Sequence, residues 1–250
     1  MLRLVKIILS TTLAIALMLL PLLNAGNKSV PQTFHPVIPV VVDTTVTEDP
    51  IEAEISDIYD SLKLEKRGLK KEAFSYAYTG YKKLIEEGDI NKEGIITICD
   101  FSQSSKRKRL YLIDLNEYKI LLNTYVAHGR NSGGEYAKKF SNRPESHQSS
   151  LGFYRTKKTY YGSHGLALTL SGLEQGINDK AERRKIVLHG SNYIGENFKR
   201  WGRYMGRSFG CPAVPMKQSK LLINKIKDGS CLFIYHPSKT YLAGSKILNG

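Results

Sequence analysis

Two residues of this 250-residue chain suggest nucleophilic catalysis. Cys211 lies in the segment Ser208-Phe209-Gly210-Cys211, and the glycine permits a sharp turn that exposes the thiol beside backbone N–H groups. Acyl transfer needs a nucleophile and an oxyanion hole together. His189 ends an apolar segment 22 residues earlier. A free thiol is only a few per cent thiolate near neutral pH, and His titrates at about pH 6.5, so a Cys211–His189 dyad is chemically sensible.

The residues around this pair resemble the YkuD-type L,D-transpeptidases of bacterial cell walls, in particular the murein L,D-transpeptidase catalytic-domain branch. The similar motifs are Leu-Gly-Phe-Tyr at 151–154, residues 173–179, Ile-Val-Leu-His-Gly at 186–190, and residues 206–215. The similarity spans roughly residues 52–248, more than a local motif would. The resemblance implies a mainly β fold, an L,D-transpeptidase-type β-sandwich or barrel, with a two-helix annex before it and a few short helices.

The resemblance also implies roles for individual residues. Cys211 matches the nucleophile and His189 the general base. The oxyanion donors fall on the turn Phe209–Cys211, chiefly the N–H groups of Gly210 and Cys211, with Ser208 and Gly190 in supporting positions. The donor would be a tetrapeptide stem of peptidoglycan and the acceptor an amine of a second stem, which gives a 3→3 cross-link. Water as acceptor would make an L,D-carboxypeptidase, and neither reaction needs a cofactor.

One position departs from the family pattern. Many members carry Arg two residues after the cysteine, where it helps to hold a substrate carboxylate, and this chain has Ala213. A guanidinium can bind a carboxylate with two hydrogen bonds, so another arginine is expected to take this role. The candidate substrate-binding residues are Arg207 first, then His164, Gly152 and Tyr154, with Arg155, Arg183 and Arg203 as weaker candidates and His128 as a further cleft candidate.

Strands are expected to position the dyad. Runs rich in β-branched and aromatic residues, separated by turn residues, predict strands at 95–99, 109–115, 118–127, 151–156, 166–170, 185–188 and 231–235. A hairpin turn is expected at Asp114 and a helix at 216–227, ending at Gly229. The interpretation is a mainly antiparallel catalytic domain over residues 91–250.

A helical annex is predicted over residues 51–90. Asp49-Pro50 is typical of a helix start, and apolar residues then recur every three or four positions from Ile51 to Leu62. Gly68 suits the helix end, and a second apolar face runs from Phe74 to Ile85. The prediction is two helices that pack on the main domain.

The first 25 residues are typical of a secretory signal peptide. Arg3 and Lys6 precede an apolar run, and Ala25 is a plausible cleavage point, with an uncut anchor as the alternative. Residues 26–50 contain four prolines and predict an extended tether, or else a strand at 37–42 added to the domain edge. The protein is therefore expected to be exported, periplasmic or cell-wall associated, and to contact the membrane only through an uncleaved signal segment.

Composition and net charge limit the classes of partner that the protein is expected to bind. Hydrophobic residues make up 41% and charged residues 24% of the chain, as in ordinary globular proteins. The net charge is +14, and without residues 1–25 the chain keeps 35 cations against 23 acids, or +12. An anionic cell-wall partner fits this charge, and nucleic acid is disfavoured in an exported protein. The run from Lys106 to Arg109 is interpreted as a solvated turn.

Two other functions remain open. A non-catalytic wall-binding module would use the basic surface and the tyrosines, although it has no need of a thiol. A zinc-dependent peptidase would use three histidines, His128, His164 and His189, although the sequence has no His-Glu-x-x-His motif and no metal is expected. Cys99 and Cys231 lie in apolar strand contexts and predict buried packing, with a disulfide between them as a conceivable alternative.

Overall fold

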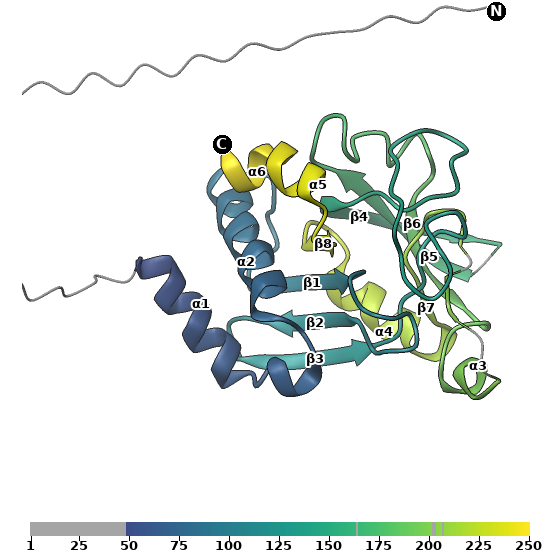
Figure 1. Cartoon of the computed structure of the whole chain (residues 1–250), viewed down its shortest axis with the longest axis horizontal. Coiled ribbons are helices and arrows are strands. Elements are labelled where there is room, and N and C mark those ends of the chain that lie inside the picture. The colour runs from purple at the N-terminus through teal and green to yellow at the C-terminus, as the bar shows by residue number, and fades with distance from the viewer. Residues whose placement is uncertain (1–48, 164, 202–203, 207) are drawn as a thin grey trace, which may run out of the picture. The chain divides into compact units, whose positions relative to one another are not determined.

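The computed structural model describes residues 49–163, 165–201, 204–206 and 208–250. Eight strands within these ranges form one sheet in the order β3-β2-β1-β8-β4-β5-β6-β7 (Figure 1). Their bounds are β1 Ile95–Asp100, β2 Leu110–Asp114, β3 Lys119–Thr124, β4 Gly152–Gly162, β5 Gly165–Gly172, β6 Val187–Ser191, β7 Ala213–Pro215 and β8 Cys231–Tyr235.

The strand pairing is mainly antiparallel, as predicted. The β1–β8 and β6–β7 pairs are parallel. The two edge strands approach each other, because Ala127, just after β3, forms a bridge to Ala213 of β7, with its N–H 2.8 Å from the Ala213 carbonyl oxygen. The sheet is therefore a nearly closed barrel, and the predicted fold class is confirmed.

Helices pack around this sheet (Figure 1). Asp49 caps the first of them by accepting a hydrogen bond from the Ile51 N–H at 3.1 Å, which satisfies one of the free donors at a helix start. The second helix packs against the first and against β1 and β8. The helices are α1 Pro50–Ser61, the 3₁₀ turn η1 Glu65–Arg67, α2 Lys71–Glu86, α3 Glu196–Arg200, α4 Met216–Ile226, α5 Lys239–Gly244 and α6 Lys246–Asn249.

Several element boundaries differ from the expected ones. The strand expected at 185–188 is β6 at 187–191, so His189 lies within it, and the strand expected at 118–127 is the shorter β3 at 119–124. Two further differences have physical reasons. Gly68, with φ of 86°, ends η1 rather than α1, because the chain already leaves the helix near Lys63, whose φ is 50°. The strand expected at 151–156 continues to Gly162, because β4 pairs with β8 over its first four residues and with β5 from Tyr154 to Gly162. The described residues from 49 onward form one compact unit.

The predicted signal peptide and most of the predicted tether lie outside the described residues. Within the described part of the chain, no helix combines the length and hydrophobicity needed to cross a membrane.

The conceivable Cys99–Cys231 disulfide is excluded by the strand register. Both cysteines are buried and free. In the parallel β1–β8 pair, Cys231 lies opposite Ile96 and Cys99 lies opposite Ile234. Three residues of offset along a strand place the two Cα atoms about 11 Å apart, whereas a disulfide requires less than about 7 Å.

Candidate active site

Strands β6 and β7 bring His189 and Cys211 to the same region. In this parallel pair His189 lies opposite Ala213, and its N–H is 3.4 Å from the Pro212 carbonyl oxygen. Cys211 lies two residues before β7, and its Sγ is 3.5 Å from the backbone N of Val187, two residues before His189 on β6. The two side chains therefore extend from adjacent chain segments into one region.

The Cys211 thiol is half-buried and held by the backbone of the neighbouring strand. Its S–H donates to the Lys185 carbonyl at 3.7 Å, and the Val187 N–H donates to Sγ at 3.5 Å. Burial raises the pKa of Cys211, while the Val187 N–H and the Arg184 guanidinium act to lower it. The resting thiol is consequently protonated, and a base must remove its proton before it can act as a nucleophile.

The His189 ring has an orientation that suits this base. His189 is buried, and its Nδ1 lies 2.9 Å from the Gly190 carbonyl oxygen. A carbonyl can only accept, so Nδ1 carries the proton and the lone pair is on Nε2. Gly190 has no space for a side chain, because a β-carbon there would lie 2.6 Å from the Ser219 Oγ of α4. The glycine therefore lets α4 pack directly behind the strand that carries His189.

The turn before Cys211 is fixed by its own hydrogen bonds. The Gly210 N–H donates to the buried Ser208 Oγ at 3.2 Å, and the Ser208 N–H donates to the His128 carbonyl at 3.3 Å. Gly210 has φ of 118°, and a β-carbon there would lie 2.7 Å from the Gln148 carbonyl oxygen. Within the described residues the Cys211 N–H has no hydrogen-bond partner. Of the two expected oxyanion donors, the Gly210 N–H already donates to Ser208 Oγ, whereas the Cys211 N–H can still donate to a ligand.

Phe209 forms an exposed platform two residues before Cys211. The ring is 61% exposed, stacks on His147 with centroids 4.5 Å apart, and has the Arg130 guanidinium 4.7 Å from its centre. Arg130 also hydrogen-bonds His147, with Nη2 3.0 Å from Nδ1. An aromatic face with a cation at its side is suited to a polar, partly apolar ligand. Sequence reasoning missed Arg130 and His147, because only the pairing of Gly129 with Ser208 brings their segments to the turn.

Arg184 is a second residue that sequence reasoning missed. Its guanidinium donates to the Ser141 carbonyl at 2.7 Å and to the Gln148 carbonyl at 2.5 Å, and it also donates to the Ser150 hydroxyl. Its Nη2 lies 3.2 Å from where a Gly210 β-carbon would be. Burial lowers the pKa of Arg184, and no acidic side chain among the described residues pairs with it. A half-buried positive charge therefore lies beside the turn 208–211.

The structure corrects the expected substrate contacts of Tyr154 and Gly152. Tyr154 is 1% exposed, and its hydroxyl donates to the Ser150 carbonyl at 3.1 Å. Gly152 packs against the buried Glu174, whose carboxylate accepts the Phe153 N–H at 2.7 Å and the hydroxyls of Tyr241 and Ser245. Both residues belong to a buried hydrogen-bond network, because both faces of β4 are covered here.

The arginine candidates have different positions. Arg207, Arg203 and the histidine candidate His164 lie outside the described residues. Arg155 faces Asp89 at 3.9 Å, and Arg183 is exposed. Ala213 itself is fully buried between β6 and residue 127, so an arginine side chain would not fit at this position.

His128 and Arg109 form a buried pair, which corrects two expectations. His128 is fully buried rather than in an open cleft, and its Nδ1 lies 2.7 Å from Arg109 Nη2. Burial and this guanidinium lower the pKa of His128 to about 3. Arg109 is also fully buried and stacks on Phe101, so the run from Lys106 is a solvated turn only as far as Lys108. Across the described ranges, no three metal-ligating side chains come together.

Known proteins were compared with the chain. An L,D-transpeptidase from Mycobacterium smegmatis shares 7% identity and a TM-score of 0.35, over 57% of this chain and 59% of that one. An L,D-transpeptidase from Xylanimonas cellulosilytica shares 15% identity and a TM-score of 0.35, over 70% of this chain and 93% of that one. The helical cell shape determining protein Pgp2 from Campylobacter jejuni shares 15% identity and a TM-score of 0.39, over 64% of this chain and 56% of that one.

The chain spans less than two thirds of the length of the M. smegmatis and C. jejuni proteins. A search of curated proteins found no match. A family model of the L,D-transpeptidase catalytic domain matches residues 65–235, which is more than half of the chain and includes both His189 and Cys211. The expectation drawn from the motifs is therefore confirmed, and the chain belongs to the family of L,D-transpeptidase catalytic domains.

Proposed function

We propose that this protein is an exported cysteine acyltransferase that acts on peptidoglycan stem peptides, with Cys211 as nucleophile and His189 as general base. The observation that carries the proposal is the convergence of the half-buried thiol, at the rigid turn 208–211, with a histidine whose Nδ1 proton is fixed by the Gly190 carbonyl. Membership of the L,D-transpeptidase family supports the substrate class.

The reaction has two halves. His189 Nε2 takes the Cys211 proton, and the thiolate attacks the carbonyl carbon on the L-centre of the diamino acid of a tetrapeptide stem. The Cys211 N–H faces the developing oxyanion, and one such donor is worth about 3 kcal/mol in the transition state. The C–N bond to D-Ala then breaks, the departing amine receives the proton from His189, and a thioester remains on Sγ.

The second half of the reaction decides the product. An amine of another stem gives a proton to His189 and attacks the thioester carbonyl. The C–S bond breaks, the thiolate regains the proton, and a 3→3 cross-link is formed. Water in place of the amine releases a tripeptide and makes the enzyme an L,D-carboxypeptidase. Access of the acceptor to the thioester therefore sets the outcome.

Intact-protein mass spectrometry tests the proposal directly. We expect the full chain to gain the mass of an acyl group when it is incubated with a disaccharide-tetrapeptide, and to gain a carbapenem adduct in a parallel sample. Cys211→Ala should gain neither, whereas Cys99→Ala, which removes a buried thiol, should retain both. Undiminished turnover by folded Cys211→Ala would refute the proposal.

Export is the part of the proposal that rests on residues 1–25. Fusion of these residues to a reporter enzyme that is active only outside the cytoplasm tests it. An active fusion supports export, and an inactive fusion that is stably produced refutes it.

A further inference from the structure

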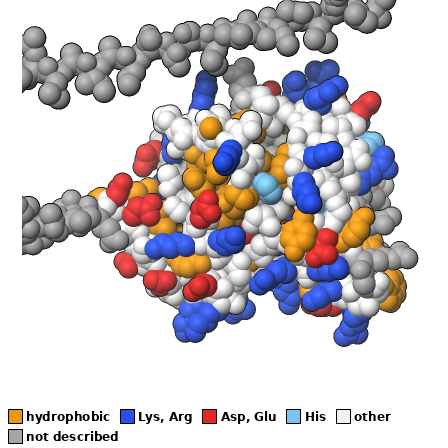
Figure 2. Space-filling view, viewed as in Figure 1, with side chains coloured by type: hydrophobic (Ala, Val, Ile, Leu, Met, Phe, Trp, Pro, Cys, Tyr) orange, Lys and Arg blue, Asp and Glu red, His pale blue; other side chains and the backbone are white. Residues whose placement is uncertain are grey.

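A basic groove lies apart from the residues assigned to catalysis. It is a hollow of about 360 Å³ with Asn123 and Tyr125 in its lining. Figure 2 shows Lys and Arg side chains at the lower margin of the domain, between the places that β3 and α3 occupy in Figure 1. The cationic residues of the groove are Lys66, Arg67, Lys106, Arg107, Lys108 and Lys199.

Backbone contacts force these cations together. The Gly68 carbonyl accepts a hydrogen bond from Gln103 Nε2 at 2.9 Å, and the Arg67 carbonyl accepts one from the Tyr111 hydroxyl at 3.1 Å. These bonds hold η1 against the turn at 103–108, where Arg107 Nη2 lies 2.8 Å from the position of a Gly68 β-carbon. Arg107 is therefore held beside the segment that carries Lys66 and Arg67, and positive charges gathered in one groove repel each other unless an anion lies among them.

Little negative charge is present to balance the groove. Lys106 pairs with Glu135 at 3.1 Å, and the other five cations make no ion pair with any described residue. Glu196 is the single acid in the lining, and its carboxylate already accepts the Tyr125 hydroxyl at 2.5 Å. The groove therefore has unsatisfied capacity for anionic groups.

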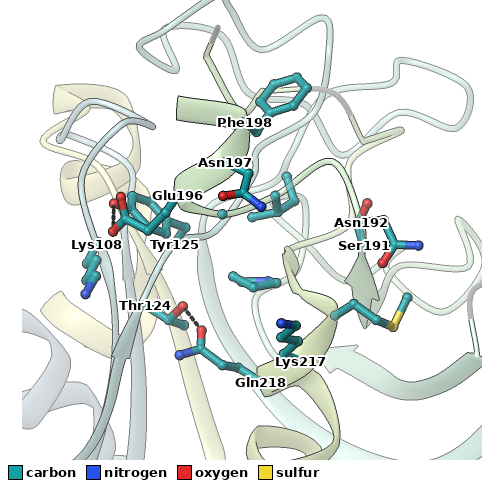
Figure 3. Close-up of a pocket in the computed structure, with 14 residues that line it drawn as sticks. Lys108, Thr124, Tyr125, Ser191, Asn192, Glu196, Asn197, Phe198, Lys217 and Gln218 are labelled. Carbon is teal, nitrogen blue, oxygen red and sulfur yellow. Dashed lines mark hydrogen bonds between the residues drawn. The ribbon is translucent and has the colours of Figure 1, made fainter. Parts of the chain in front are cut away.

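The basic groove continues into a second hollow of about 410 Å³ that shares Lys108, Tyr125 and Glu196 with it. Figure 3 shows Lys108 on one side of this hollow and Ser191 and Asn192 on the opposite side. Amide and hydroxyl side chains line it, and these match the donors and acceptors of a peptide backbone. Ser191 ends β6, two residues after His189, so a ligand in the two hollows approaches the strand that carries the proposed base.

We propose that the basic groove and the adjoining hollow form one binding site for a carboxylate-bearing peptide polymer, namely peptidoglycan stems other than the stem that acylates Cys211. The assignment rests on the proposed function, because that function supplies a polymer with repeated carboxylates. Arg67 and Arg107 provide planar guanidinium groups for paired hydrogen bonds to carboxylates. The adjoining hollow, in which amide and hydroxyl side chains lie beside Lys108, Lys217 and Glu196, then receives the peptide portion.

Two variants that lose the same charge test the site. The groove variant carries Lys66→Gln, Arg67→Gln, Arg107→Gln and Lys108→Gln. The control variant carries four changes at exposed lysines elsewhere, Lys158→Gln, Lys180→Gln, Lys239→Gln and Lys246→Gln. Binding of fluorescent poly-glutamate and of polyphosphate is measured by anisotropy over a salt series, and retention on purified sacculi is measured by co-sedimentation.

We expect the groove variant to bind poly-glutamate and sacculi about tenfold more weakly than the wild type, because four screened contacts of a few tenths of a kcal/mol each add up to that factor. The affinity of the control variant for both ligands should stay within about twofold of the wild-type affinity, since the charges it loses are dispersed over the surface. Equal losses of affinity in both variants would overturn the proposal, because they would show that net charge rather than the groove determines binding. Tighter binding of polyphosphate than of poly-glutamate at equal ionic strength would overturn the carboxylate assignment.

Acylation of Cys211 separates this proposal from the proposed function. Both variants should acylate with an isolated disaccharide-tetrapeptide at the wild-type rate, since neither alters the nucleophile turn. Wild-type protein that binds sacculi through the groove but never acylates would refute the proposed function and leave the binding result standing. Normal acylation with no loss of binding in the groove variant would refute the groove alone.

Discussion

Replacing Arg184 with methionine should make the Cys211 thiol less reactive without removing any atom of the dyad. Arg184 Nη2 lies 3.2 Å from the position of a Gly210 β-carbon. One further Cα–Cα step of about 3.8 Å places Cys211 within about 9 Å of this charge. At ~8 Å and an effective dielectric constant of about 20, a unit positive charge stabilises a thiolate by ~2 kcal/mol.

Because Arg184 is half-buried rather than fully enclosed, solvent screening reduces this to ~1 kcal/mol. Arg184→Met should therefore raise the pKa of Cys211 by about 0.7 and lower the thiolate fraction at neutral pH about fivefold. Methionine keeps most of the side-chain volume, but it cannot donate the bonds that hold residues 141–150. Arg184→Lys preserves the charge and should restore most of the reactivity.

The assay is the rate of iodoacetamide alkylation of Cys211 between pH 6 and 10. Arg183→Met is the matched control, since Arg183 is the exposed neighbour and its loss should leave the profile unchanged. Thermal unfolding of each variant shows whether the domain remains folded. A folded Arg184→Met variant whose profile superimposes on that of the wild type would refute the electrostatic role of Arg184.

Three other perturbations have defined outcomes. Gly210→Ala should abolish acylation and lower stability by ~1–3 kcal/mol, because φ of 118° and a nearby carbonyl exclude a β-carbon; acylation kinetics and urea unfolding check this, and wild-type rates would contradict it. Burial raises the pKa of Glu174 above 4.5, so its contribution to stability is present below pH 4.5 and lost as pH rises through the folded pKa. The stability advantage of wild type over Glu174→Gln should therefore shrink between pH 4 and pH 7 in urea unfolding, and a constant difference would count against this. Burial also raises the pKa values of Cys99 and Cys231, so iodoacetamide should label Cys211 alone in folded protein and all three thiols in guanidinium chloride, as mass spectra would show.

Local patterns predicted most of the elements, because burial of one face imposes a period on the sequence. Residues 231–235 are almost all apolar and show little alternation of polar and apolar side chains. They form β8, which is buried throughout. The helix at 216–227 ends within one residue of its expected bound. In contrast, β7 has three residues and no period, and only its tertiary pairing with β6 and with Ala127 makes it a strand. Short elements of this kind carry no local signal.

The same distinction applies to the candidate site. Cys211 and His189 could be found because their neighbours, Gly210 and Gly190, are required locally by a turn and by a helix contact. The sequence could not reveal three other residues near the turn 208–211, namely Arg184, Arg130 and His147. They lie in loops that come close to this turn only in the folded chain. Tyr154 was misplaced for the opposite reason: a strand pattern does not reveal whether a second layer covers its outer face.

The position of β8 in the sheet has a consequence for how the protein matures. β8 lies between β1 and β4, and among the described strands the three on one side join the four on the other through β8 and the Ala127–Ala213 bridge. During synthesis, the chain thus holds two incomplete half-sheets until residues 231–235 are available. Pairings this distant in sequence form slowly. The sheet that carries Cys211 is therefore completed only after β8 has paired with β1 and β4, and a variant that lacks residues 231–235 should be prone to aggregation because it exposes two unpaired strand edges.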